Sequence, residues 1–245
     1  MRALTNAEIL EVWESGWQAT PAQCAVSLLA TASPGIAPGE VASYNVGRRD
    51  ALLLQLRGLM FGPKIVSLTL CPKCCDGVEL EFNVADFSAP ALPAESIGDS
   101  TIVVDNYEVS FRLPNSLDQI AIAKTRDVEA ARRTLLSRCV KSARREGADV
   151  LPELLPASVV TAMTDRMAEL DPLASVFLAV NCPGCQCQWQ SLFDVCDFFW
   201  RELSSYARRL LQEVHLLASA YGWSEAEILS LSSGRRRLYL EMVSR

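Results

Sequence analysis

The sequence contains a single histidine, His215, among its 245 residues. It also lacks a catalytic zinc motif, a P-loop and a dinucleotide-binding loop, because its glycines are scattered and the fragment at Gly62 stands alone. His215 lies in an apolar helical run, where a packing or helix-surface position is expected. The presence of a catalytic Ser-His or Cys-His pair stays an open alternative, but no residue pattern supports one. The sequence therefore predicts a non-enzymatic protein.

Long apolar runs are missing as well. Even the run 173–180 is far shorter than the roughly 20 residues that cross a bilayer. Asn6 and three glutamates interrupt the first 17 residues, so no secretory signal is expected. We therefore expect a soluble protein in a cytoplasm, without membrane contact. The formal charge of −6 opposes nucleic-acid binding and favours protein partners.

What the chain does have is a globular composition and nine cysteines. Half of its residues are hydrophobic and 21% are charged, which is enough apolar material for a real core. Thiols stay reduced in a cytoplasm, so paired cysteines are better interpreted as metal ligands or redox groups than as disulfides. An odd number would in any case leave one cysteine unpaired.

Two hairpins with the same design are predicted far apart in the chain. Strand-like alternation in KIVSLTL and VELEFNV surrounds a CPKC turn, and SVFLAVN and CQWQSLF surround a CPGC turn. A further hairpin is predicted around Asp105-Asn106, and residues 86–100, with Pro90 and Pro93, are expected to form a linker. Helices are predicted over 5–17, 21–33, 48–60, 116–145, 157–170, 194–221, 224–231 and from 234 onward.

These elements predict an α+β, mainly helical fold, in which two β-hairpins form a split zinc-ribbon-like pair. An inserted hairpin-helix module separates the halves, and helical segments stand at both ends. The predicted division is a helical segment 1–62, ribbon halves 63–86 and 173–195, an inserted module 87–172 and a helical segment 196–245.

The ribbon pair carries the clearest chemistry. Two residues between cysteines let one tight turn direct both thiolates at a metal, and two such turns complete a tetrahedral Zn(Cys)4 site. The predicted ligands of one structural Zn²⁺ are Cys71, Cys74, Cys182 and Cys185. A closed four-sulfur site can neither activate water nor polarise a substrate, so the metal's expected role is in folding.

Several features leave alternatives open. The 107 residues between the two turns exceed the usual ribbon spacing. Cys75 and Gln186 follow the second ligands where a ribbon commonly has Gly, the residue that tolerates positive φ. Cys75 or Cys187 could replace a ligand, and each pair could be a buried thiol pair or a redox pair. The remaining cysteines, Cys24, Cys139 and Cys196, are expected in helical core positions.

Basic residues cluster in two places, along 116–145 and at the start of the last helix. The simplest interpretation is that these basic residues form a solvated face. The alternatives are that they bind an acidic protein surface or nucleic acid. The residues are Arg132, Arg133, Arg138, Lys141, Arg144, Arg145, Arg235, Arg236 and Arg237.

Several segments in matching order resemble one family. They are 48–63 (RRDALLLQLRGLMFGP), 107–118 (YEVSFRLPNSLD), 191–203 (SLFDVCDFFWREL), 213–243 and the two CPxC turns. They resemble the baseplate hub assembly proteins, or chaperones, of contractile phage tails and related contractile injection systems of the T-even phage type. This resemblance implies contacts with baseplate hub, spike or tail-tube initiator proteins. It places the protein in the cytoplasm during assembly, and leaves open whether the protein stays in the finished tail or injection particle. It implies no catalytic residues.

The first hypothesis is therefore a structural assembly protein of a baseplate hub on a zinc-stabilised scaffold. The alternatives are a zinc-ribbon regulator that binds nucleic acid or polymerase, and a cysteine redox enzyme. The regulator would bring the arginines together beside the CPxC turns, and the enzyme would need an exposed thiolate of low pKa. The direct partner and the oligomeric state are not predicted.

Overall fold

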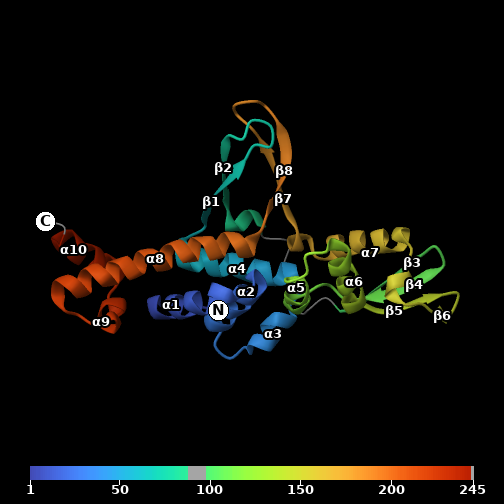
Figure 1. Ribbon diagram of the computed structural model, residues 1–245, viewed down its shortest axis with the longest axis horizontal. Coiled ribbons are helices and arrows are strands. Elements are labelled where there is room, and N and C mark those ends of the chain that lie inside the picture. Colours follow the sequence, from blue (N-terminus) through green and yellow to red (C-terminus); the bar gives the residue numbers. More distant parts are fainter. Residues whose placement is uncertain (88–97, 244–245) are drawn as a thin grey trace.

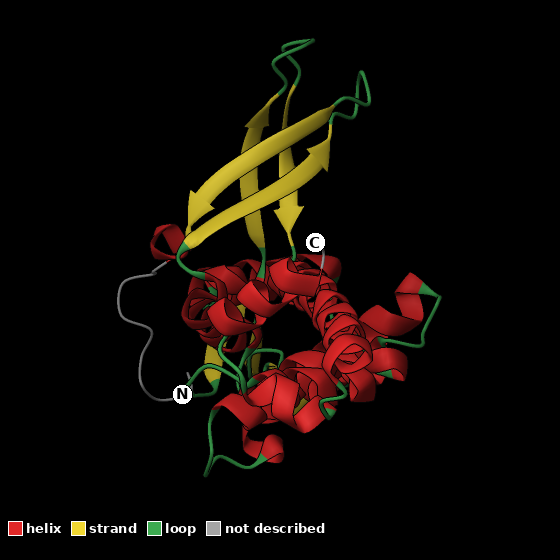
Figure 2. Cartoon of the chain, turned by 90° about the vertical axis from the view of Figure 1, so that its left-hand side faces the viewer, coloured by secondary structure: helices red, strands yellow, loops and turns green. Residues whose placement is uncertain are grey.

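A computed structural model describes residues 1–87 and 98–243 of the chain. Helices form the body of an elongated molecule, from which two β-hairpins rise side by side (Figures 1 and 2). The inserted module lies at one end of the body and the last helices lie at the other (Figure 1). The prediction of a mainly helical chain with small antiparallel sheets is confirmed.

The first helices begin and end where the sequence indicates. α1 (Asn6–Ser15) starts with a capping box of Thr5 and Glu8, and α2 (Pro21–Ala32) with one of Thr20 and Gln23. α4 (Val46–Phe61) ends at Gly62, whose φ of 90° only glycine adopts without strain. Among these first helices, the 3₁₀ turn η1 (Gly16–Gln18) and α3 (Pro38–Ser43) were not predicted, because six residues or fewer carry little periodicity.

The N-terminal helices share their core with the long C-terminal helix α8 (Val195–Tyr221). Phe199, Leu203 and Leu210 on α8 pack with Leu29 of α2 and Leu56 of α4, and all five are almost completely buried. The two ends of the chain therefore form one hydrophobic core.

The two hairpins stand on this helical body. β1 (Lys64–Leu70) pairs with β2 (Gly77–Asn83), and β7 (Val176–Asn181) pairs with β8 (Gln188–Phe193), each antiparallel without a bulge. The 3₁₀ turns η2 (Val84–Phe87) and η4 (Pro172–Ala174) connect them to neighbouring segments. The predicted linker 86–100 lies mostly in 88–97, outside the described residues.

The inserted module has a second core of its own. Its sheet has the order β3 (Ser100–Val104), β4 (Tyr107–Phe111), β5 (Val140–Arg145), β6 (Ala148–Asp149). The predicted turn is confirmed, because both Asp105 and Asn106 have positive φ, as a tight two-residue hairpin turn requires. The module's helices are α5 (Ser116–Ile122), α6 (Val128–Cys139), the 3₁₀ turn η3 (Pro152–Leu154) and α7 (Ala157–Leu170).

The single helix predicted over 116–145 is wrong in its last part. Residues of β5 pair with β4, so Lys141, Arg144 and Arg145 stand on a strand and not on a helix. Val140 and Ala143 turn inward to the module's core, and this non-local pairing outweighs a local composition that suits a helix. A break at 123–127 further divides the predicted helix into α5 and α6.

The chain ends in a small cluster of helices at the far end of α8. Gly222, in the left-handed conformation, ends α8, and a capping box of Ser224 and Glu227 starts α9 (Glu225–Ser230). α10 (Ser233–Val243) folds back so that Leu217 and Ile228 are buried. Among the described residues, no helix has the length and apolar character that crossing a membrane requires.

Candidate metal centre

Each CPxC sequence forms the tip of a hairpin, and the two tips have the same backbone hydrogen bonds. The N–H of Cys75 donates to the carbonyl of Cys71 at 2.9 Å, and the N–H of Gln186 donates to the carbonyl of Cys182 at 3.0 Å. The first cysteine of each tip also donates its N–H across the turn at 2.9 Å, to the carbonyls of Asp76 and Cys187. The repeated sequence pattern thus folds into a repeated structure.

The residue after each second cysteine adopts the left-handed conformation that glycine usually supplies. Cys75 has φ of 61° and Gln186 has φ of 57°. Such a conformation costs a non-glycine residue about 1–2 kcal/mol. The departure from the usual ribbon sequence therefore leaves the tight turn intact at the expense of backbone strain.

The four predicted ligand residues lie together at the tips. All four Sγ atoms lie within 4.8 Å of one another, and the pairs Cys71–Cys185 and Cys74–Cys182 are 3.5 Å apart. Four sulfurs placed tetrahedrally at about 2.3 Å from one metal ion would be about 3.8 Å apart. The spacing of these thiols therefore fits a single metal ion held by both hairpins.

The hairpins pack on each other directly below the sulfurs. Val78 and Val180 are buried there, and Trp189 covers them in part. The hydroxyl groups of Thr69 and Ser191 share a hydrogen bond of 3.1 Å between the hairpins. Figure 2 shows the two pairs of strands crossing face to face above the helices. The inner faces thus bring the tips together across 107 intervening residues.

The sulfurs differ in their electrostatic surroundings. Burial alone would raise the pKa of Cys71, but the backbone N–H groups of Cys74 and Lys73 outweigh it and lower that pKa to about 6. For Cys74, the N–H of Asp76 favours the thiolate, yet burial and the neighbouring sulfurs prevail and raise its pKa. Because Cys71 is only 1% exposed, its thiolate is better placed to bind a metal than to attack a disulfide in solvent.

The other cysteines and the histidine lie elsewhere. Cys75 is exposed and Cys187 is partly exposed, and neither belongs to the four-sulfur group found among the described residues. Cys24, Cys139 and Cys196 are buried, as the sequence predicted. His215 is exposed on the surface of α8.

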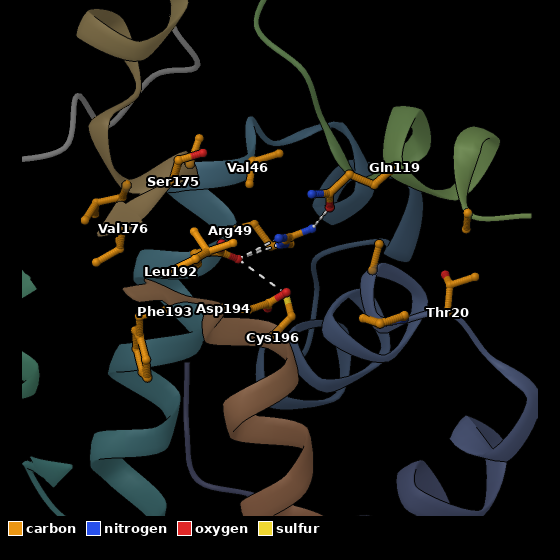
Figure 3. A pocket seen from close by; sticks show the side chains of 16 residues that line it. Thr20, Val46, Arg49, Gln119, Ser175, Val176, Leu192, Phe193, Asp194 and Cys196 are labelled. Atoms are coloured by element: carbon orange, nitrogen blue, oxygen red, sulfur yellow. Dashed lines mark hydrogen bonds and ion pairs between the residues drawn. The ribbon is translucent and has the colours of Figure 1, made fainter. Parts of the chain in front are cut away.

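A cavity of about 330 Å³ at the foot of the hairpins contains charged residues that sequence reasoning did not single out (Figure 3). Arg49 is 2% exposed, and its guanidinium donates to Asp50 at 2.8 Å and to Ser116 and Gln119 of α5. Burial raises the pKa of Asp50 to about 6 although Arg49 opposes this. The thiol of Cys196 also donates to Asp50.

The charged cluster around Arg49 joins α4 of the helical body to α5 of the inserted module. Among the described residues, every buried side-chain nitrogen and oxygen has a hydrogen-bond partner. Nearby, the N–H of Gly47 donates to the buried carboxylate of Asp171 at 3.0 Å, which attaches the end of the inserted module to α4. The cavity's polar groups therefore already hold the helical body and the inserted module together. In the sequence, the only indication of these buried charges was that charged residues occur within apolar helical runs.

Residues 28–200 match the family of the T4 bacteriophage base plate protein. The chain belongs to this family. The match runs from α2 to the first turns of α8 and includes both hairpins and the inserted module. No curated protein and no solved structure matches the chain.

Membership of the base plate family confirms the coarser part of the predicted resemblance and indicates a structural role among other baseplate proteins. Segment 213–243, one of those that carried the resemblance, lies outside the matched residues.

Proposed function

We propose that this base plate family protein is an assembly protein of a baseplate hub, which acts in the manner of a chaperone through protein–protein contacts. In this proposal a structural Zn²⁺, bound by Cys71, Cys74, Cys182 and Cys185, stabilises the scaffold. The observation that carries the proposal is the gathering of four thiols from two distant hairpins within 4.8 Å. Family membership supports the baseplate setting, whereas the hub and the chaperone role rest on the sequence resemblance.

Zinc would supply stability that the hairpins lack. An isolated two-stranded hairpin is at best marginally stable in water. Structural zinc in small peptides contributes on the order of 10 kcal/mol of apparent binding free energy. The ion would thus hold the two hairpins together as one unit, which we call the ribbon platform (residues 64–83 and 176–193).

The same ligand set argues against catalysis at this site. Four protein sulfurs fill a tetrahedral zinc ion and leave no position for water or substrate. The polar groups of the cavity beneath the platform are already hydrogen-bonded to one another. A non-enzymatic role is therefore the function that fits both sites best.

The outer face of the platform supports a role in protein contacts. Alternate residues of β1 turn away from the second hairpin, and Val66, Leu68 and Leu70 are exposed there, Leu68 by 70%. Their cross-strand neighbours include Glu79 and Glu81. A row of exposed aliphatic side chains on a protruding hairpin is characteristic of a protein-binding surface. In the proposal this face contacts a hub, spike or tail-tube initiator protein.

The distribution of basic residues does not favour a nucleic-acid-binding regulator. The arginines and Lys141 of the two basic clusters stand on α6, β5 and α10, and α10 lies at the opposite end of the molecule from the other two (Figure 1). Arg138, Arg144 and Arg236 form ion pairs within the chain. No basic face beside the CPxC turns is formed by these residues.

The test is to co-express the full chain with its cognate baseplate proteins and to measure which of them co-purify. We expect Cys71→Ser combined with Cys182→Ser to remove the metal and abolish hub-protein binding. Cys75→Ser is the matched control, because it replaces an exposed cysteine of the same turn outside the four-sulfur group.

Intact hub-protein binding by the double variant would show that the zinc platform is not the binding element. Co-purification of nucleic acid in place of baseplate proteins would contradict the assembly role.

A further inference from the structure

A second apolar surface lies in the inserted module, at a distance from the ribbon platform (Figure 1). Between α6 and α7 is an open groove with a volume of about 420 Å³. Its lining residues recur three and four positions apart on each helix, so one side of each helix faces the groove. They include Val128, Arg132 and Leu135 on α6, and Val160, Met163 and Met167 on α7.

The groove is lined mainly by apolar side chains. Met163 is buried at its floor, whereas Val128 at the start of α6 is 77% exposed. Leu135, Leu136 and Met167 are partly exposed. Methionine side chains are flexible and adapt to differently shaped apolar partners. Val160 and Met163 also belong to the module's buried core, together with Val109 and Phe111, and Leu136 and Met167 pack against that core. The groove is therefore the partly exposed outer side of this core.

Basic side chains outnumber acidic ones between residues 124 and 133, the part of the chain that forms one end of the groove. Arg132 lines the groove, Arg133 follows it on α6, and Lys124 and Arg126 precede the helix; all four are exposed. Within residues 1–87 and 98–243, none of these four forms an ion pair with an acidic side chain. Two acids lie at the same end of α6: Asp127 caps its N-terminus, and the exposed Glu129 lies in its first turn. By contrast, Arg138 on the same helix is paired with Asp118.

We propose that the α6–α7 groove binds an amphipathic helix of a partner protein, with apolar residues at helical spacing and acidic residues beside them. A groove between two helices presents the shape into which a third helix places residues three and four positions apart. Arg132 and the exposed basic residues near it in sequence favour an acidic flank on the partner, because complementary charge guides and orients docking. This proposal rests on the proposed role in protein contacts. It adds a second binding surface, separate from the ribbon platform.

The experiment measures binding of two synthetic peptides to the full-length protein by fluorescence anisotropy. Both peptides carry leucines at positions i, i+3, i+4 and i+7 of one helix; the flanking positions are Glu in the first peptide and Lys in the second. We expect the Glu peptide to bind and the Lys peptide to bind about tenfold more weakly. Arg132→Glu should weaken the Glu peptide about tenfold and strengthen the Lys peptide.

Two further variants locate the site. Val128→Glu places a negative charge in the groove at an exposed position, so the protein should fold normally and lose binding of the Glu peptide. Arg144→Glu is the control, because Arg144 is an exposed arginine of β5 outside the groove, and both affinities should stay unchanged.

Three results would overturn the proposal. One is equal affinity for the two peptides, and another is an affinity that Arg132→Glu leaves unchanged. The third is a wild-type dimer that Val128→Glu converts to a monomer in analytical ultracentrifugation, because a second copy would then cover the groove. Failure of the peptides to bind while hub proteins still co-purify would reject the groove alone and leave the proposed function standing.

Discussion

Replacing Asp118 with asparagine should destabilise the protein strongly, although the residue touches neither hairpin. Asp118 is fully buried at the start of α5. Its carboxylate accepts two hydrogen bonds from Arg112, at 2.6 and 2.8 Å, and one from Nε of Arg138 at 2.7 Å. The N–H of Asn115 donates a fourth at 3.0 Å. One carboxylate thus holds α5, α6 and the end of β4 together.

The magnitude follows from the exposure of the partners. Removing one member of a buried ion pair costs about 3–5 kcal/mol, because the other charge is left without a partner. The side chains of Arg112 and Arg138 are 24% and 38% exposed, so water replaces part of the lost interaction. We therefore expect Asp118→Asn to lower the free energy of unfolding by about 2–4 kcal/mol at neutral pH.

The effect should depend on pH with a definite sign. Burial opposes ionisation of Asp118, but the hydrogen bonds from Arg112, Asn115 and Arg138 prevail and lower its pKa. A carboxyl whose pKa is lower in the folded state stabilises the fold above its unfolded pKa of about 3.9, and loses this effect as the pH falls through the folded pKa. The difference between wild type and Asp118→Asn should therefore be constant above about pH 5 and shrink below about pH 4.

Urea unfolding followed by far-UV circular dichroism measures this difference, and Asp149→Asn is the matched control. Asp149 also pairs with an arginine, Arg144, but both side chains are largely exposed. An exposed pair contributes about 0–1 kcal/mol. If Asp118→Asn and Asp149→Asn had equal effects, or if the Asp118 difference grew in acid, the reasoning would be refuted.

Three more substitutions or treatments give clear expectations. A Cβ on Gly47 would overlap the carboxylate of Asp171, so Gly47→Ala should lower the thermal midpoint by several degrees, whereas Gly39→Ala, with open space around it, should not. Cys75→Gly with Gln186→Gly should relieve left-handed strain and raise stability by about 1 kcal/mol in urea unfolding; a lower stability would contradict the strain. A thiol reagent should modify only Cys75 and Cys187 in the native zinc-loaded chain. Chelation of the zinc should expose four more thiols, and the three helical cysteines should react only on unfolding. If chelation left the number of reactive thiols unchanged, the proposed ligand set would be contradicted.

Local signals allowed much of the fold to be predicted from the sequence. The starts of α1 and α2 were predicted to within one residue, and alternation on both sides of each CPxC turn identified the hairpins. The pair Asp105-Asn106 fixed a further turn. These features act through neighbouring residues, so a single sequence contains them.

Features that depend on distant pairing were not predictable in this way. Residues of β5 have a composition that suits a helix, and only their pairing with β4 makes them a strand. The buried charges of Arg49 and Asp118 are stabilised by partners on other elements, which no local pattern reveals. Within the candidate site, the cysteine spacing suggested the ligand set, but the closeness of the two tips depends on packing between the inner faces of the hairpins.

Metal analysis of the purified full-length protein tests the central claim most directly. Inductively coupled plasma mass spectrometry should find one zinc ion per chain in the wild type and in Cys75→Ser, and none in the Cys71→Ser, Cys182→Ser double variant. A wild-type chain that is folded without metal, or a double variant that retains its zinc, would contradict the account.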